Sequence, residues 1–180
     1  FTLIFIHDTE HTHRLILVLS AFTMVVGIQG AIVQNNYRRI ISFNLISHIG
    51  TMVAGLGLFT PLALTGTVFY LMHDIVIKAC LFLFTGVLRQ LGGCSRITEL
   101  GGLYRRHPVI SFLFLMAAFS IAGVPPLSGF WGKLILIQAG LDAERYWVVA
   151  VILAASLLTL YSMMQIWSEA FWREPSSGST

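Results

Sequence analysis

Long apolar stretches without charge alternate along the chain with short polar connections. The first two, Leu15 to Tyr37 and Ile40 to Thr60, are each long enough, at about 1.5 Å per residue, to cross a hydrocarbon core of about 30 Å. Further apolar stretches follow at 63–88, 109–123 and 125–171. None of them alternates with a period of two residues, and lipid cannot satisfy open strand edges, so the pattern predicts helices.

These stretches predict an all-α polytopic membrane protein, a bundle of about five transmembrane helices with the last one broken near Pro125–Lys133. We expect that last span to break after Lys133, with 125–140 counting as a sixth helix if it stands apart. Because the chain opens in mid-hydrophobic sequence, we interpret it as a piece of a longer protein. The predicted organisation is an extramembrane connector at 1–14, a transmembrane bundle at 15–172 and a disordered tail at 173–180.

The composition favours a membrane protein over a soluble one. Hydrophobic residues make up 56% of the chain and charged residues 11%, whereas a soluble chain carries about 25% charged residues. The formal net charge of +3 is too small, and its charges are too scattered, for nucleic-acid binding. The surroundings implied by this composition are therefore a lipid bilayer, and we expect no nucleic-acid partner.

Nothing in the sequence indicates a cofactor, a metal site or an enzymatic nucleophile. The chain has no nucleotide-binding glycine loop. His7, Glu10, His11 and His13 lie close together, but no further residues complete a coordination sphere, so we interpret them as part of a solvated loop. We expect no cofactor, no metal and no catalytic residue in this chain.

Several ionisable residues interrupt the apolar stretches and are the candidates for function. Insertion of a charge at the centre of a spanning helix costs at least about 2.5–3.5 kcal/mol. Asp74 and Lys78 are four residues apart, so they share a helix face, and we expect them to pair inside the bundle. His73 is adjacent. A structural ion pair that locks two helices, and a hydrogen-bonded core histidine, are the alternatives to a role in proton transfer.

The most specific local feature is the segment Gly123-Val-Pro-Pro-Leu-Ser-Gly-Phe-Trp-Gly-Lys133. Its two prolines remove backbone donors, and unwound backbone at membrane depth is tolerated only in protein or along a cavity. Broken helices of this kind build ion sites in transporters. Desolvation disfavours the charged form of a buried lysine, so a buried Lys133 would release a proton more readily than an exposed lysine does. A plain loop between two separate helices is the alternative.

Two further polar positions have an open interpretation. Arg38 keeps its proton at physiological pH, so it can tune the charge of a neighbour but hardly carry a proton, and an interfacial anchor is its alternative. We interpret His48 as a helix-contact residue rather than a member of a proton relay, with the relay as the alternative.

The ordered motifs of the chain resemble those of the proton-translocating antiporter-like family. That family includes the multisubunit Na+/H+ antiporters of the Mrp (or Mnh) type and the pumping subunits of respiratory complex I. The resemblance extends from about Leu15 to Trp172 and covers the later half of such a subunit. Its motifs are Tyr37-Arg-Arg-Ile-Ile-Ser-Phe43, Ser47-His-Ile-Gly50, Phe69-Tyr-Leu-Met-His-Asp-Ile-Val-Ile-Lys78, Gly101-Gly-Leu-Tyr-Arg-Arg-His-Pro108 and Ala122-Gly-Val-Pro-Pro-Leu-Ser-Gly-Phe-Trp-Gly-Lys133.

The resemblance implies specific roles. It gives Lys78 and His73 places in a central hydrophilic axis and makes Lys133 the terminal proton carrier on a broken helix. Many relatives have lysine at the position of Arg38, which leaves charge tuning for the arginine. Together with Asp74, these residues form the predicted proton-translocation path.

The function that this resemblance implies is a membrane subunit that exchanges protons for Na+ or another monovalent cation, without catalysis. Its partners would be the other subunits of a hetero-oligomeric antiporter complex in the cell inner (plasma) membrane. The alternative is a proton-pumping subunit of an NADH–quinone oxidoreductase or a membrane-bound hydrogenase. A membrane enzyme or a purely structural subunit is a third class, and the sequence offers no nucleophile or metal constellation for the enzyme.

Overall fold

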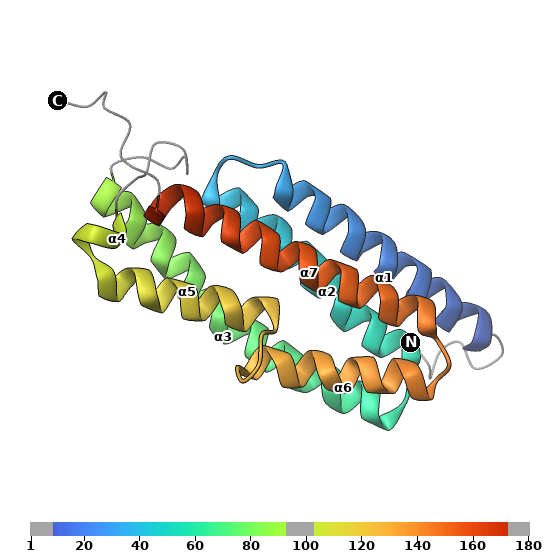
Figure 1. Cartoon of the computed structure of the whole chain (residues 1–180). Helices are drawn as coiled ribbons and strands as arrows, with labels where there is room; N and C mark the ends of the chain where they lie inside the picture. Colours follow the sequence, from blue (N-terminus) through green and yellow to red (C-terminus); the bar gives the residue numbers. More distant parts are fainter. Residues whose placement is uncertain (1–8, 93–102, 173–180) are drawn as a thin grey trace.

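The computed structural model describes residues 9–92 and 103–172, which form a bundle of helices (Figure 1). Within these residues every regular element is helical, so the predicted all-α class is confirmed. The helices are α1 (Thr9–Ile32), α2 (Tyr37–Leu58), α3 (Pro61–Gly92), α4 (Leu103–Arg106), α5 (Pro108–Ala122), α6 (Ser128–Asp142) and α7 (Tyr146–Trp167), and a π-helical turn, η2 (Ser168–Trp172), extends α7.

Four of the described segments are long and apolar enough to cross a membrane: His11–Ile32, Tyr37–Leu58, Pro61–Gln90 and Tyr146–Trp172. Helices α5 and α6 have 15 residues each and therefore reach only about 22 Å. Figure 1 shows them nearly in line, one following the other across the bundle. Together they make one broken crossing beside four continuous ones, which is the architecture of a polytopic membrane protein.

The position of the break differs from the sequence-based expectation. We expected the last span, 125–171, to be broken after Lys133. The chain instead unwinds between Ala122 and Ser128, and α6 runs continuously through Lys133 to Asp142. The prolines, which cannot donate a backbone hydrogen bond, end α5 ahead of the lysine. The broken crossing is the fourth one, and α7 is a separate, continuous helix.

Local sequence signals define several helix ends. The Asn36 side chain caps α2 by accepting a hydrogen bond from the backbone nitrogen of Arg38 (3.1 Å), and Thr60 Oγ1 accepts one from the backbone nitrogen of Ala63 at the start of α3 (3.1 Å). Helix α5 is capped at its C-terminal end by Gly123, whose φ of 86° favours glycine. Helix α1 begins at Thr9, so it includes Thr9 to Arg14 of the predicted connector. The predicted tail, 173–180, lies outside the described residues.

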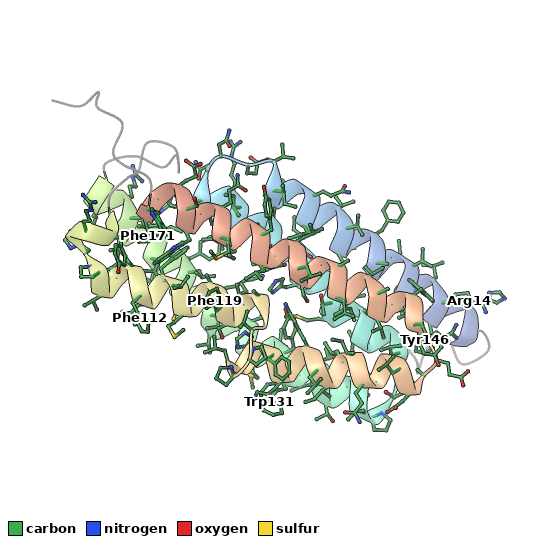
Figure 2. The ribbon with its side chains drawn as sticks, viewed as in Figure 1. Arg14, Phe112, Phe119, Trp131, Tyr146 and Phe171 are labelled. Atoms are coloured by element: carbon green, nitrogen blue, oxygen red, sulfur yellow. The ribbon has the colours of Figure 1, made fainter. Side chains whose placement is uncertain are left out.

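Helix packing in the bundle depends on small residues. Helices α1 and α2 form a close antiparallel hairpin, and α7 lies alongside both (Figure 1). A β-carbon added at Gly27 of α1 would lie 2.5 Å from the backbone nitrogen of Ser47 in α2. Figure 2 shows Arg14 and Tyr146 at one end of the bundle, Phe171 at the other end and Trp131 on its outer side.

We expect Gly27→Ala to destabilise the subunit by about 1–3 kcal/mol, because the added methyl group meets backbone that cannot yield. Gly86→Ala is the matched control, since a β-carbon there meets nothing within 4 Å and alanine favours helix by up to about 1 kcal/mol. The measurement is the midpoint of thermal unfolding of the detergent-purified protein. Equal midpoints for the two variants would contradict this account of the hairpin.

Candidate functional site

A cluster of buried ionisable side chains lies close to the midpoints of α2, α3 and the broken crossing. His48, Asp74, Lys78 and Lys133 are exposed by 2%, 6%, 5% and 6%. We call this group, together with its neighbours, the polar cluster. It consists of His48 from α2, Tyr70, His73, Asp74 and Lys78 from α3, and Ser128 and Lys133 from α6.

Asp74 is the centre of the polar cluster. Its Oδ1 atom lies 2.7 Å from His48 Nδ1, and its Oδ2 atom lies 3.3 Å from Lys78 Nζ. The expected pairing of Asp74 with Lys78 inside the bundle is therefore confirmed. Lys78 Nζ contributes an ion pair but has no hydrogen bond of good geometry to a described residue. One carboxylate thus contacts both a histidine on a neighbouring helix and a lysine on its own helix.

The contact with Asp74 assigns the proton on His48. An ionised carboxylate only accepts hydrogen bonds, so Nδ1–H of His48 donates to Asp74. The Tyr70 hydroxyl lies 2.9 Å from the same nitrogen. In neutral His48 the other ring nitrogen, Nε2, then carries a lone pair and is a proton acceptor. A charge on Asp74 and a proton on His48 are therefore coupled directly.

Lys133 is held by the end of helix α5. Its Nζ donates to the carbonyl oxygens of Ile121 (3.1 Å) and Ala122 (2.9 Å). The last carbonyls of a helix lack partners within the helix and lie at the negative end of its dipole, so they stabilise an ammonium group. The same Nζ lies 5.9 Å from the centroid of the Tyr70 ring. Tyr70 therefore stands between Lys133 and the pair of His48 and Asp74.

Two glycines bring the start of α6 against α3 and the end of α5. A β-carbon at Gly129 would collide with the Ser120 carbonyl oxygen and lie 2.8 Å from His73 Nε2, and one at Gly132 would lie 3.0 Å from Tyr70 Cδ2. This close approach lets His73 Nδ1 form a 2.9 Å hydrogen bond with Ser128 Oγ. The spacing of glycines and lysine in the motif therefore has a geometric reason.

Arg38 lies outside the polar cluster. Its side chain is exposed, and its Nε donates to Thr85 Oγ1 at 3.3 Å. Ten residues separate it from His48 along α2, which is about 15 Å of helix. The structure brings together His73, Asp74, Lys78 and Lys133, but not Arg38, and charge tuning by Arg38 stays a prediction.

The partners that join these groups were not predicted from the sequence. His48 contacts a neighbouring helix through the charged Asp74, and the choice between a helix contact and a proton relay stays open. Tyr70 and Ser128 were not singled out. Tyr70, Asp74 and Lys78 follow one another at intervals of four residues, so the polar stripe on one face of α3 was a usable signal. Among the described residues, no three His, Cys, Asp or Glu side chains gather as a metal site would require.

Buried titratable groups that meet at mid-bundle around a broken helix define a class of polytopic membrane protein built around an internal polar axis. Residues 1–159 match the family model described as "NADH:quinone oxidoreductase/Mrp antiporter, TM". The chain belongs to this family.

Relatives of known name resemble nearly the whole chain. The D-type subunit of the Na+/H+ antiporter of Alkalihalophilus pseudofirmus is 48% identical and that of Bacillus subtilis 41%, each over 97% of this chain and 35% of the relative. A chain of the Mrp complex structure from Dietzia sp. DQ12-45-1b is 39% identical and superposes with a TM-score of 0.89, over 96% of this chain and 32% of that one. The sequence thus spans about a third of these proteins.

Loss of one partner from the Asp74–Lys78 pair should be far more costly than loss of both. Asp74→Asn leaves a buried ammonium group without its counter-ion, and we expect a destabilisation of about 3–5 kcal/mol. The double variant Asp74→Asn/Lys78→Met should recover most of this, because neutral groups of similar shape remain. Thermal unfolding of the purified protein tests the ordering, and a double variant no more stable than the single one would contradict it.

Proposed function

We propose that this chain is part of a membrane subunit of a multisubunit monovalent cation (Na+)/proton antiporter, and that protons move along its polar cluster. The observation that carries the proposal is the direct linkage of buried titratable groups at mid-bundle, with Asp74 2.7 Å from His48 and 3.3 Å from Lys78. The names of the relatives, which are Na+/H+ antiporter subunits, supply the exchanged ions.

Each residue of the predicted path has a role in this proposal. Asp74 stabilises the proton on His48 Nδ1 and the positive charge on Lys78, so a change in the protonation of His48 alters that of Lys78. Lys133 accepts and releases protons at the broken helix, where the two α5 carbonyls stabilise its charged form. His73 connects the break to α3 through Ser128. Arg38 contributes positive charge at the start of α2 rather than a proton.

Lysine and histidine suit this work for different reasons. Burial disfavours the charged form of lysine, whereas the nearby carbonyls and the Asp74 carboxylate favour it. Histidine has two ring nitrogens, one of which carries the proton in the neutral form, so it can accept a proton on one nitrogen and release one from the other. A shift of water or of a neighbouring charge is then sufficient to move a proton between neighbouring groups. No nucleophile is required, so we propose a transporter subunit rather than an enzyme.

The setting follows from the same proposal. The partners would be the other subunits of a hetero-oligomeric antiporter complex, and the membrane would be the bacterial plasma membrane, as the bacterial relatives suggest. The alternative is a pumping subunit of an NADH–quinone oxidoreductase, which the description of the matching family also names, or of a membrane-bound hydrogenase. Identification of the co-purifying subunits separates the two, and redox subunits would favour the alternative.

Lys133→Ala should abolish exchange or lower it at least about 100-fold while the complex still assembles, since alanine cannot hold a proton. Lys133→Arg should also fail, because arginine does not release its proton at physiological pH. The measurement is the pH change induced by Na+ in everted membrane vesicles that contain the complete complex, with subunit levels followed by blotting.

Gln138→Ala is the matched control, because Gln138 is exposed on the same helix. We expect it to behave like the parent protein. If Lys133 were only an anchor, Lys133→Arg would retain exchange, since both side chains can extend toward a polar surface. Near-normal exchange in both Lys133 variants would overturn the proposed path.

A further inference from the structure

A second line of buried polar atoms joins α2 to α7, one helical turn before His48 on α2. Asn44 is fully buried, and its Nδ2 donates to Ser162 Oγ of α7 (3.0 Å) and to the Ile40 carbonyl oxygen (3.1 Å). Ser162 is also fully buried and donates to the Thr159 carbonyl oxygen (2.9 Å). This contact fixes the orientation of the Asn44 amide and sets its Oδ1 atom apart from its Nδ2 donor.

Two buried atoms of α2 have no hydrogen-bond partner among the described residues: Asn44 Oδ1 and His48 Nε2. The residues are four apart on α2, so they lie on one face with β-carbons about 5–6 Å apart. Because the Nδ1–H group of His48 donates its hydrogen bond to Asp74, His48 Nε2 is an acceptor, as Asn44 Oδ1 is. Two acceptors cannot form a hydrogen bond with each other. A single donor with two hydrogens placed between them satisfies both acceptors, and water is such a donor.

We infer that a water molecule is held between Asn44 Oδ1 and His48 Nε2, and that it forms a lateral arm through which protons reach or leave the polar cluster. The inference rests on the proposed function and adds to it a residue and a direction. Asn44 acts as a positioning residue, since its oxygen holds the water while His48 exchanges the proton.

The proton transfer along this arm is balanced at every atom. A protonated water gives its proton to His48 Nε2, and the new Nε2–H bond is matched by loss of the Nδ1 proton to Asp74 Oδ1, 2.7 Å away. The imidazole ring stays neutral, and one proton has passed from the water at Nε2 to Asp74 on α3. The reverse sequence returns it, so the arm can serve uptake or release.

The arm has a direction along the bundle. Gln165 lies one turn beyond Ser162 on α7, and its Oε1 is another buried acceptor without a partner among the described residues. Asn44 lies toward the start of α2 and Gln165 toward the end of α7, and Figure 1 shows these two helix ends at the same end of the bundle. The arm therefore leads from the polar cluster toward that end.

The simpler role for Asn44 is to bind α2 to α7 through Ser162, as buried amides commonly do between membrane helices. That role needs Nδ2 and leaves the position dry. The inferred role needs an acceptor oxygen and water at the same place. The two roles therefore predict different hydration of this position. They also predict different effects on exchange when Asn44 is replaced by a side chain without an acceptor oxygen.

Hydration is measured by cysteine labelling in the complete complex in membranes, after Cys80→Ala and Cys94→Ala. Asn44→Cys and Ile41→Cys are compared for their rate of reaction with a small water-soluble methanethiosulfonate, followed by mass spectrometry. Both native residues are fully buried on α2, and Ile41 lies nearer the helix start. We expect Asn44→Cys to react at least about 10-fold faster, and equal or slower labelling overturns the arm.

Function is measured with the pair Asn44→Ala and Asn44→Ser, which differ by a single hydroxyl oxygen. We expect Na+-driven proton exchange, normalised to assembled complex, to fall about 10-fold in Asn44→Ala and to stay within about 3-fold of the parent in Asn44→Ser. Equal rates in the two variants overturn the arm even if the position is wet. Retained exchange in Lys133→Ala would instead overturn the proposed function and leave the labelling result standing.

Discussion

The structure depends on keeping the charges of Asp74, Lys78 and Lys133 inside an apolar bundle. Each charge placed alone at this depth would cost several kcal/mol, so each must find an opposite charge or a set of oriented dipoles. Asp74 satisfies two positive or proton-donating partners at once, one on α2 and one on its own helix. The relative positions of α2 and α3 follow from this requirement, because a shift of either helix would separate His48 from its only charged partner among the described residues of α3.

The broken crossing answers the same requirement for Lys133. Within the described residues near it there is no carboxylate in contact, and its ammonium group relies on carbonyl oxygens instead. Carbonyls free to accept from a side chain occur at a helix end, and the Pro125–Pro126 step places such an end at mid-span. Gly129 and Gly132 then let α6 come close enough for the lysine to reach back to α5. Prolines, glycines and lysine thus act as one unit.

Much of the fold could be predicted from the sequence because lipid permits few alternatives to helices for uncharged stretches of this length. The Asp74–Lys78 pair could also be predicted, since a spacing of four residues places both side chains on one helix face. The contacts of His48 and Lys133 were not, because they depend on how one helix is rotated against another. The break was placed after Lys133 for a related reason: the prolines mark a break, but only the packed structure shows that the lysine reaches backward across it.

Stability and proton transfer make opposite demands on such a cluster. A network in which every group is satisfied is stable, but it holds each proton in one place. Here His48 Nε2 is buried without a hydrogen-bond partner among the described residues, and Lys78 Nζ has only its ion pair with Asp74, although Asp74 and Lys133 are well supported. Natural proteins tolerate such deficits mainly at functional sites. In the proposed antiporter subunit, the satisfied groups would hold the bundle together, and the unsatisfied ring nitrogen of His48 would be the place where a proton arrives.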